Sequence, residues 1–443
     1  MVKKPTSGTA TYPTIKNGKH FIGSRRLPLI SVAIVAAIFV SYAAVFFVPQ
    51  HNQNLAYATA DEKAYSVDMA LVSANTRFAF TLFNALVADE GNNNIFISPL
   101  SISTALAMTY NGAGGTTRDA MAETLELSSL SLETVNREYA NLIGSLENAD
   151  EQVDILIGNS IWLKQEFEPL VNTDFLDRVK TSFNGEILTR DFVDPQTIND
   201  INGWVDEKTE GNIEEVIQTI EPELVMFVIN ALYFQGDWVT QFDEAKTQTQ
   251  DFLLPEGQTV DVEMMSTSGA FRYYAGENVQ VARLPYGRDK IAMYIFLPAE
   301  DVPLDSFIAK LNPTVHEDYI RRLSPVDDLT VKLPKFRVEY GVKRLNTILE
   351  KLGMGIAFNP HAANLSGIAS TTAGNLYISY VDHKATIEVN EQGTEAAAAT
   401  NVGIGLTAMP PSFVVNRPFF FEIRDDRSGS ILFMGKIQNP TQT

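Results

Sequence analysis

The chain contains the stretch Glu391-Gln392-Gly393-Thr394-Glu395-Ala396-Ala397-Ala398-Ala399-Thr400 near its C-terminal end. Four consecutive alanines suit a helix, but the glycines on both sides make a helix a weak prediction. With the two-residue period of a strand, one face carries only small side chains, namely Thr394, Ala396, Ala398 and Thr400. Composition leaves two interpretations open, a flexible linker and a strand that can slide into a crowded sheet.

The residues after this stretch have no obvious regular structure. No charged residue lies between Ala396 and Asn416, and Pro410-Pro411 cannot continue a central strand. A loop this long in a compact domain is usually functional or disordered. The neighbouring sequence must therefore decide what the segment does.

Residues 1–60 form a basic leader that is directed to a membrane. They carry six basic and no acidic residues, and an uncharged apolar run at 27–48 is long enough to span a bilayer. Ala56-Tyr57-Ala58 and Ala58-Thr59-Ala60 both fit the small-x-small rule of signal peptidase. Cleavage as a signal peptide and retention as an anchor both stay open. In either case we expect residues 61–443 outside the cell, secreted or tethered to the outer face of the membrane.

Charge and cysteine content exclude several classes of function. The chain has 34 basic residues, six of them in the leader, which leaves 28 against 54 acidic residues in the exported part. Such an excess of negative charge argues against binding to nucleic acid or sulfated polysaccharides. Because the chain has no cysteine, a thiolate nucleophile, a thiolate metal site and disulfide bonds are all excluded.

The remaining residues predict one α+β domain at 61–443, because no repeat or Pro/Ser-rich linker divides them. Hydrophobic periodicity and capping signals predict helices at 64–88, 98–110, 116–125 and 198–216. Apolar runs predict strands at 155–163, 225–234, 279–284, 291–297, 329–338, 376–381 and 419–423.

Signatures of enzymes are missing from the sequence. Only His316, His361 and His383 lie outside the leader, and neither a Gly-x-Ser-x-Gly nor a His-Glu-x-x-His motif is present. Asp150 and Glu151 are adjacent carboxylates, which we interpret as a solvated loop and not as a glycosidase pair. The glycines at 111–115 are interpreted as a helix stop. We expect no enzymatic activity, no cofactor and no metal.

Seven stretches, taken in chain order, resemble the signatures of the serpin family of serine protease inhibitors. They are Asn94-Ile95-Phe96-Ile97-Ser98-Pro99-Leu100-Ser101-Ile102-Ser103, Ile229-Asn230-Ala231-Leu232-Tyr233-Phe234-Gln235-Gly236-Asp237-Trp238, Leu284-Pro285-Tyr286, Leu333-Pro334-Lys335-Phe336, the run His383-Lys384-Ala385-Thr386-Ile387-Glu388-Val389-Asn390-Glu391, and Arg417-Pro418-Phe419-Phe420 with Leu432-Phe433-Met434-Gly435-Lys436-Ile437. The resemblance extends over about residues 67–440. It implies the serpin fold, in which several helices surround three β-sheets and a reactive-centre loop is exposed, here at about 391–411.

The resemblance gives the opening stretch a role as the hinge of that loop. In the family, a protease attacks the loop as a substrate, and the cut loop inserts into the main sheet and traps the acyl-enzyme. Gly393, Thr394 and the residues from Ala396 to Thr400 fit the inhibitory pattern of the family. The full hinge that the resemblance implies is Glu391, Gly393, Thr394, Glu395, Ala396, Ala397, Ala398, Ala399 and Thr400. The partner implied is a serine protease, or a cysteine protease, bound covalently to a monomer. The alternative is a non-inhibitory serpin that acts as a carrier, chaperone or surface-binding module.

Counting from both ends of the loop locates the expected reactive bond. Inhibitory loops of the family typically place the attacked residue fourteen positions after the hinge glycine, which here is Thr407, and a count of eleven back from Pro418 gives the same residue. The resemblance thus implies that the bond attacked is Thr407–Ala408, with Leu406 and Met409 as alternatives. No Arg or Lys lies between Lys384 and Arg417. The loop therefore offers no cation to the buried Asp of a trypsin-like pocket, and elastase-like or subtilisin-like enzymes are the expected targets.

Further residues match positions that control insertion in the family. Ser98, Ser101, Asn230 and His383 match a polar cluster beneath the main sheet, Trp238 matches the point where the loop first enters, and Lys335 with Glu391 matches a pair at the base of the hinge. Taken singly, each is equally an ordinary cap, core residue or surface ion pair. Asn364-Leu365-Ser366 also fits a glycosylation acceptor.

Overall fold

The computed structural model describes residues 67–442, except for 222–223, 371–374 and 395–410. Tyr65–Thr443 form one compact unit and Met1–Ala64 another, of which only the first is described below. The predicted leader, with its apolar run at 27–48, lies outside the described residues. So do Glu395 to Thr400 of the hinge and the predicted reactive bond.

Nine α-helices are present in the described residues, and four of them begin at a residue whose side chain caps the helix. Asp68, Ser98 and Ser131 each accept a backbone N–H bond at a helix start, which satisfies donors that the helix itself leaves free. The helices are α3 (Met69–Glu90), α4 (Pro99–Tyr110), α5 (Gly115–Thr124), α6 (Leu132–Glu147), α7 (Thr173–Phe183), α8 (Gln196–Lys208), α9 (Leu304–Ile308), α10 (Pro313–Arg322) and α11 (Asn346–Lys351).

The longest of these helices, α3, is long and apolar enough to cross a membrane. Its apolar side chains, however, are buried in the core of the domain, with Phe78, Leu82 and Phe83 fully covered. A helix that is buried on much of its surface passes the same test of length and composition. We therefore describe α3 as a core helix.

A nine-stranded sheet makes up the part of the domain that carries the chain's last strands. Its order is β1-β15-β14-β8-β7-β6-β9-β13, with β5 paired to β6. The strands are β1 (Ile95–Ile97), β5 (Gln248–Leu253), β6 (Thr259–Ala275), β7 (Val279–Tyr286), β8 (Ile291–Pro298), β9 (Ser324–Pro334), β13 (Ser412–Val414), β14 (Phe419–Asp425) and β15 (Ser430–Ile437).

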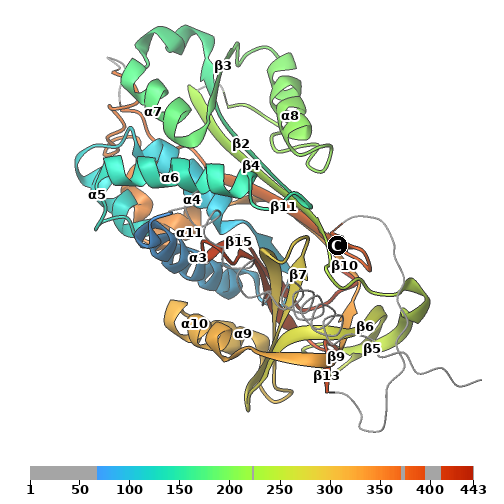
Figure 1. Ribbon diagram of the computed structural model, residues 1–443. Coiled ribbons are helices and arrows are strands. Elements are labelled where there is room, and N and C mark those ends of the chain that lie inside the picture. The colour runs from blue at the N-terminus through green and yellow to red at the C-terminus, as the bar shows by residue number, and fades with distance from the viewer. Residues whose placement is uncertain (1–66, 222–223, 371–374, 395–410, 443) are drawn as a thin grey trace, which may run out of the picture. The chain divides into compact units, whose positions relative to one another are not determined.

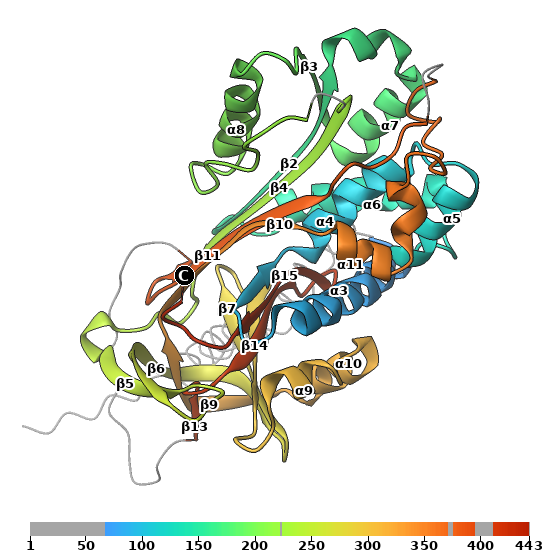
Figure 2. The same ribbon diagram turned by 180° about the vertical axis from the view of Figure 1, so that it is seen from behind.

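Two smaller groups of strands lie next to each other along the length of the domain (Figures 1 and 2). The first has the order β12-β4-β2-β3, and the second pairs β10 with β11. Their strands are β2 (Val153–Lys164), β3 (Glu186–Arg190), β4 (Met226–Asp237), β12 (Gly393–Thr394), β10 (Phe336–Arg344) and β11 (Asp382–Val389).

Both faces of β4 are covered, which explains its almost continuous apolar sequence. Helices α4 and α6 lie on one side of β2 and β4, and α8 lies on the other (Figure 1). Side chains alternate accordingly: Leu232 and Phe234 belong to the main core, whereas Phe227 and Ala231 join a second cluster beneath α8.

The predicted α+β class is confirmed, and three predicted elements need correction. The helix predicted at 198–216 ends at Lys208, because Glu210 and Gly211 have positive φ angles and the chain folds back over α8. There the Asn202 side-chain oxygen accepts hydrogen bonds from the backbone N–H groups of Val216 and Ile217. These N–H groups are therefore satisfied although the residues are not helical.

The strands predicted at 329–338 and 376–381 also differ. The first is two strands, since the chain leaves β9 at Pro334 and starts β10 at Phe336. Residues 376–381 are not a strand, because their backbone bonds go elsewhere: Ile378 N–H donates to Ala357, and Val381 N–H to the side chain of Asn346. On their other side lies a cavity.

Candidate functional site

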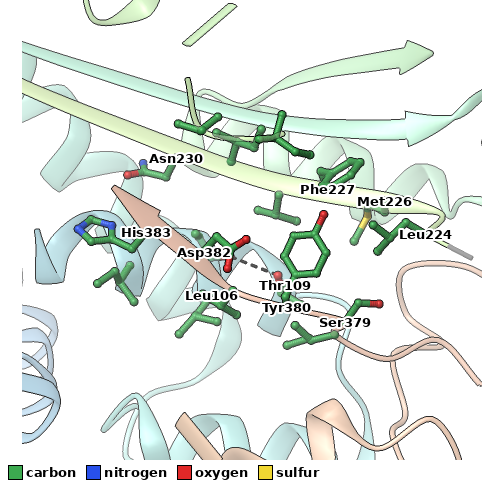
Figure 3. A pocket seen from close by; sticks show the side chains of 18 of the residues that line it. Leu106, Thr109, Leu224, Met226, Phe227, Asn230, Ser379, Tyr380, Asp382 and His383 are labelled. Carbon is green, nitrogen blue, oxygen red and sulfur yellow. Dashed lines mark hydrogen bonds between the residues drawn. The ribbon is translucent and has the colours of Figure 1, made fainter. Parts of the chain in front are cut away.

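The candidate site is a slot between β4 and β11. Each strand is paired on its outer side, β4 with β2 and β11 with β10, but among the described residues no strand pairing joins β4 to β11. A cavity of about 500 Å³ lies between them, shown in Figure 3. It is lined by β4, by α4 and by residues 375–384. Along residues 224–231 and 375–384, the facing edges therefore border a cavity that none of the described residues fills.

The chain already begins to occupy one end of this slot. After β11, a short turn leads to β12, in which Gly393 pairs with Asp237 and Thr394 with Gly236. This pairing is antiparallel to β4, and the turn makes β12 antiparallel to β11 as well. A strand that continued along this path would thus run antiparallel to both of its neighbours.

Only glycine fits at position 393. Its φ angle is +152°, and a Cβ atom there would lie 2.2 Å from the carbonyl oxygen of Gly236. A side chain would therefore push the start of β12 away from β4. The turn before it is held by Asn390, whose side-chain oxygen accepts bonds from the backbone N–H groups of Gln392 and Gly393.

Trp238 fixes the turn from the β4 side. Its backbone N–H donates to the carbonyl of Gln392 at 2.9 Å, and its indole Nε1 donates to the carbonyl of Asn390 at 3.0 Å. The indole stacks on Tyr286 with ring centroids 4.2 Å apart. The tryptophan is thus rigid, and it anchors the point at which the chain enters the slot.

Glu391 ties the same turn to a neighbouring strand. Its carboxylate lies 2.9 Å from Lys335 Nζ and accepts a 2.6 Å bond from the Thr247 hydroxyl. Burial raises the pKa of Glu391, but the bonds from Lys335 and Thr247 outweigh it and hold the pKa below the ordinary value. Because Glu391 is only 4% exposed, this ion pair is better shielded than a surface pair.

The predicted polar cluster lies at the middle of the slot. The backbone N–H of Ser98 donates to His383 Nε2 at 3.1 Å, and the Ser98 hydroxyl donates to the carbonyl of Leu432. The Ser101 hydroxyl donates to the carbonyl of Asn230 at 3.4 Å. Because Nε2 of His383 accepts a bond, the imidazole is neutral at that nitrogen, and burial lowers the pKa of His383 to about 4.

The structure thus brings together Ser98, Ser101, Asn230 and His383 in one cluster, and Trp238, Lys335, Glu391 and Gly393 in another. Sequence reasoning missed Thr247, for which no motif gave a signal, and Asn390, whose side chain could have been read as a turn signal three residues before a glycine. Asn364 is exposed, and its side chain accepts a bond from the Ser366 hydroxyl. Within the described ranges, no group of His, Asp or Glu residues could hold a metal ion.

The chain is similar to known proteins in both sequence and structure. A family model described as Serpin (serine protease inhibitor) matches residues 73–440. Antithrombin-III from Homo sapiens is 34% identical over 383 residues, which cover 84% of this chain and 82% of that protein. An uncharacterized serpin-like protein from Methanosarcina acetivorans is 33% identical over 381 residues, or 84% and 86% of the two chains.

Solved structures give the same result. The native state of tengpin, a thermophilic serpin, has a TM-score of 0.75 and 33% identity, covering 83% of this chain and 94% of that one. Thyroxine-binding globulin in complex with thyroxine has a TM-score of 0.75 and 29% identity, covering 84% and 99%. The chain belongs to the serpin family, and the predicted family and fold are confirmed. Since a hormone-binding globulin is among its neighbours, inhibition has to be argued from the site.

Proposed function

We propose that the protein inhibits proteases as a suicide substrate, by taking its own cut loop into the slot between β4 and β11. The observation that carries this proposal is the combination of an empty slot with a chain that already pairs at one end of it, at Gly393 and Thr394. Both edges of the slot offer backbone groups that an added strand would pair. Loop insertion in serpins is a known case of strand addition.

The register of β12 supports this direction of insertion. If the pairing of Thr394 with Gly236 continued, Ala396 would lie opposite Phe234 and Ala398 opposite Leu232, both of which face the core. Small side chains are what such a crowded position accepts. Further along, residues 402, 404 and 406 would face the same side, and these are Val, Ile and Leu. An alternating pattern of this kind fixes strand register.

The length of the slot is consistent with the proposed reactive bond. Its lining on the β4 side ends at Leu224, which the same register places opposite Leu406. A loop cut after Thr407 would fill the slot without excess chain. The register of β12 and the count along the loop are separate arguments, and both support Thr407 as the attacked residue.

The proposed chemistry is that of an interrupted acyl transfer. The serine hydroxyl of the protease attacks the carbonyl carbon of Thr407, and the bond to the nitrogen of Ala408 breaks, with the proton passing to that amine as it leaves. An ester between Thr407 and the protease remains. If the loop inserts before water hydrolyses this ester, the protease is carried to the far end of the slot while still attached.

The uncharged loop limits the class of target. A trypsin-like pocket needs Arg or Lys at the attacked residue, whereas Thr407 suits the small or apolar pockets of elastase-like and subtilisin-like enzymes. Such a target is a serine protease, or a cysteine protease with a similar pocket. The leader at 1–60 further supports action outside the cell, with the inhibitor secreted or tethered to the membrane as a monomer.

The test is to incubate the full chain with elastase, with subtilisin and with trypsin, and to separate the products on a denaturing gel. We expect a covalent complex with elastase or subtilisin, and a released fragment that begins at Ala408 by mass spectrometry. Clean cleavage of the loop without any complex would contradict inhibition and would favour the alternative, a non-inhibitory carrier, chaperone or surface-binding module.

A further inference from the structure

The turn between β11 and β12 is bonded on its outer side to the segment that follows β4. The carbonyl of Asn390 accepts a bond from the indole Nε1 of Trp238, and the carbonyl of Gln392 accepts one from the Trp238 backbone N–H. The carbonyl between them, that of Glu391, accepts a 2.8 Å bond from the N–H of Phe242. Three consecutive carbonyl groups of the turn therefore have partners in that segment.

The N–H groups of the same turn are bonded from within, by one side chain. Asn390 Oδ1 accepts a bond from the N–H of Gln392 at 3.1 Å and another from the N–H of Gly393 at 3.3 Å. Two donors converge on this atom, which identifies it as the oxygen of the side-chain amide. Asparagine is suited to this position because its short side chain reaches backbone N–H groups two residues further along the chain.

Gly393 depends on Asn390 for both of its backbone groups. The bond from Trp238 N–H to the Gln392 carbonyl makes Gly393 and Asp237 a non-hydrogen-bonded pair, so the N–H and the carbonyl of Gly393 point away from β4. The carbonyl accepts a 3.1 Å bond from the Asn390 N–H, and the N–H donates to Asn390 Oδ1. Because Gly393 is buried, loss of the Asn390 side chain would leave an unsatisfied N–H group.

We infer that Asn390 is the positioning residue for the first step of insertion. Its side chain fixes the turn, so that Gly393 and Thr394 pair with β4 while the loop is still uncut. A strand that starts from an existing pair only has to grow, whereas a strand that starts from an open chain must first order the turn, at a cost in conformational entropy. Since insertion competes with hydrolysis of the acyl-enzyme, the ordered turn favours insertion. This effect on the competition rests on the proposed function.

The first test measures the turn in the uncut full chain by amide hydrogen exchange, followed by mass spectrometry of peptides that cover 390–394. In Asn390→Ala the amides of Gln392 and Gly393 lose their acceptor and should exchange about ten times faster than in the parent. Asn390→Asp keeps an oxygen at this place and should stay within about threefold of the parent. Equal exchange in Asn390→Ala and the parent would overturn the inference.

The second test measures the ratio of cleaved protein to covalent complex on a denaturing gel, with elastase or subtilisin. The ratio should rise about fivefold in Asn390→Ala and stay within about twofold of the parent in Asn390→Asp. Gln392→Ala is the matched control in the same turn, because its side chain donates to Glu244 on the neighbouring 3-10 helix, at 3.3 Å. An unchanged ratio in Asn390→Ala, or an equal rise in Gln392→Ala, would overturn the inference.

A third comparison separates positioning from a general loss of stability. Asn359→Ala removes the same kind of bond elsewhere, since Asn359 Oδ1 accepts from the N–H of His361 at 2.9 Å. Thermal unfolding of the uncut variants should show a loss for Asn359→Ala as well, but its ratio of cleaved protein to complex should equal that of the parent. If both alanine variants raise the ratio in proportion to their loss of stability, Asn390 has no positioning role.

These measurements keep the inference and the proposed function apart. If the parent traps a protease but Asn390→Ala changes neither the exchange nor the ratio, the inference fails and the proposed function stands. If the parent forms no complex with any protease, the proposed function fails. The exchange of the Gln392 and Gly393 amides then decides by itself whether Asn390 fixes the turn.

Discussion

Asn230 and His383 face the slot from opposite edges, and each is held by the start of α4 and not by the other. Ser98 N–H donates to the imidazole of His383, while the Ser101 hydroxyl donates to the carbonyl of Asn230. The side-chain nitrogen of Asn230 donates to Asn159 on β2, and its side-chain oxygen is buried without a hydrogen-bond partner among the described residues. The two edges of the slot are thus both bonded to the start of one helix, α4.

Acid should destabilise the protein through His383. Its pKa is lowered from 6.5 to about 4 by burial, so the unfolded chain binds this proton at a higher pH than the folded chain does. The free energy of unfolding therefore falls as pH drops from about 6.5 to about 4, by on the order of 3 kcal/mol. We expect His383→Asn, measured by denaturant unfolding over this range, to remove most of that slope.

The control for this experiment is His361→Asn, because His361 is exposed. That variant should keep the slope of the parent. An unchanged slope in His383→Asn would show that the acid sensitivity has another source.

Glu391→Gln should loosen the turn that leads into the slot. The pKa of Glu391 is below its ordinary value in the folded protein, so its contribution is present above about pH 4.5 and is lost as pH falls below that value. We expect a loss of about 1–2 kcal/mol at pH 7, since Lys335 is partly exposed and the pair is partly screened. The loss should shrink at pH 4 and below. Thermal unfolding at both pH values measures it.

Glu263→Gln is a matched control for this prediction. Its carboxylate lies 3.9 Å from the same Lys335 nitrogen but is 71% exposed. We expect an effect below about 0.5 kcal/mol. A cost equal to that of Glu391→Gln would mean that net charge, and not the buried contact, determines the result.

Ala396→Arg should convert the inhibitor into a substrate. If the pairing of β12 with β4 continued on insertion, residue 396 would lie opposite Phe234, whose side chain is buried in the core, and an arginine there would have to be buried without a partner. Insertion should slow at least tenfold, and the ratio of cleaved protein to complex should rise on a denaturing gel. Ala397→Arg, opposite the half-buried Tyr233 on the other face, should have a smaller effect. Equal effects would contradict the proposed register.

Thr407→Arg should move the target class from elastase-like to trypsin-like enzymes. The new cation matches the buried aspartate of a trypsin-like pocket, and we expect the rate of complex formation with trypsin to rise about a hundredfold or more. The matched change Met409→Arg should not have this effect if Thr407 is the attacked residue. Trypsin complexes formed by Met409→Arg alone would shift the reactive bond by two residues.

The sequence was sufficient for the fold class, the family and most elements, because these depend on local patterns. The apolar run of β4, the Ser-Pro start of α4 and the glycine stop after it are all short-range signals. Such features leave a direct trace in residue type.

What the sequence could not provide depends on contacts between distant segments. Residues 376–381 have the composition of a strand, but the backbone N–H groups of Ile378 and Val381 donate to the distant residues Ala357 and Asn346, which no local pattern encodes. Helix α8 ends at Lys208, and the Asn202 side chain bonds the backbone of Val216 and Ile217, eight or more residues after that end. The contact of Phe227 with Tyr380 joins residues more than 150 positions apart.

The antiparallel start of β12 has a consequence for how such an inhibitor would be used. If the proposed insertion takes place, the loop that follows β12 fills the slot between β4 and β11. A filled slot would offer no edge for a second event, so each molecule would act once. The capacity to restrain a protease would then be set by how many copies are present, and new synthesis, not turnover, would restore it.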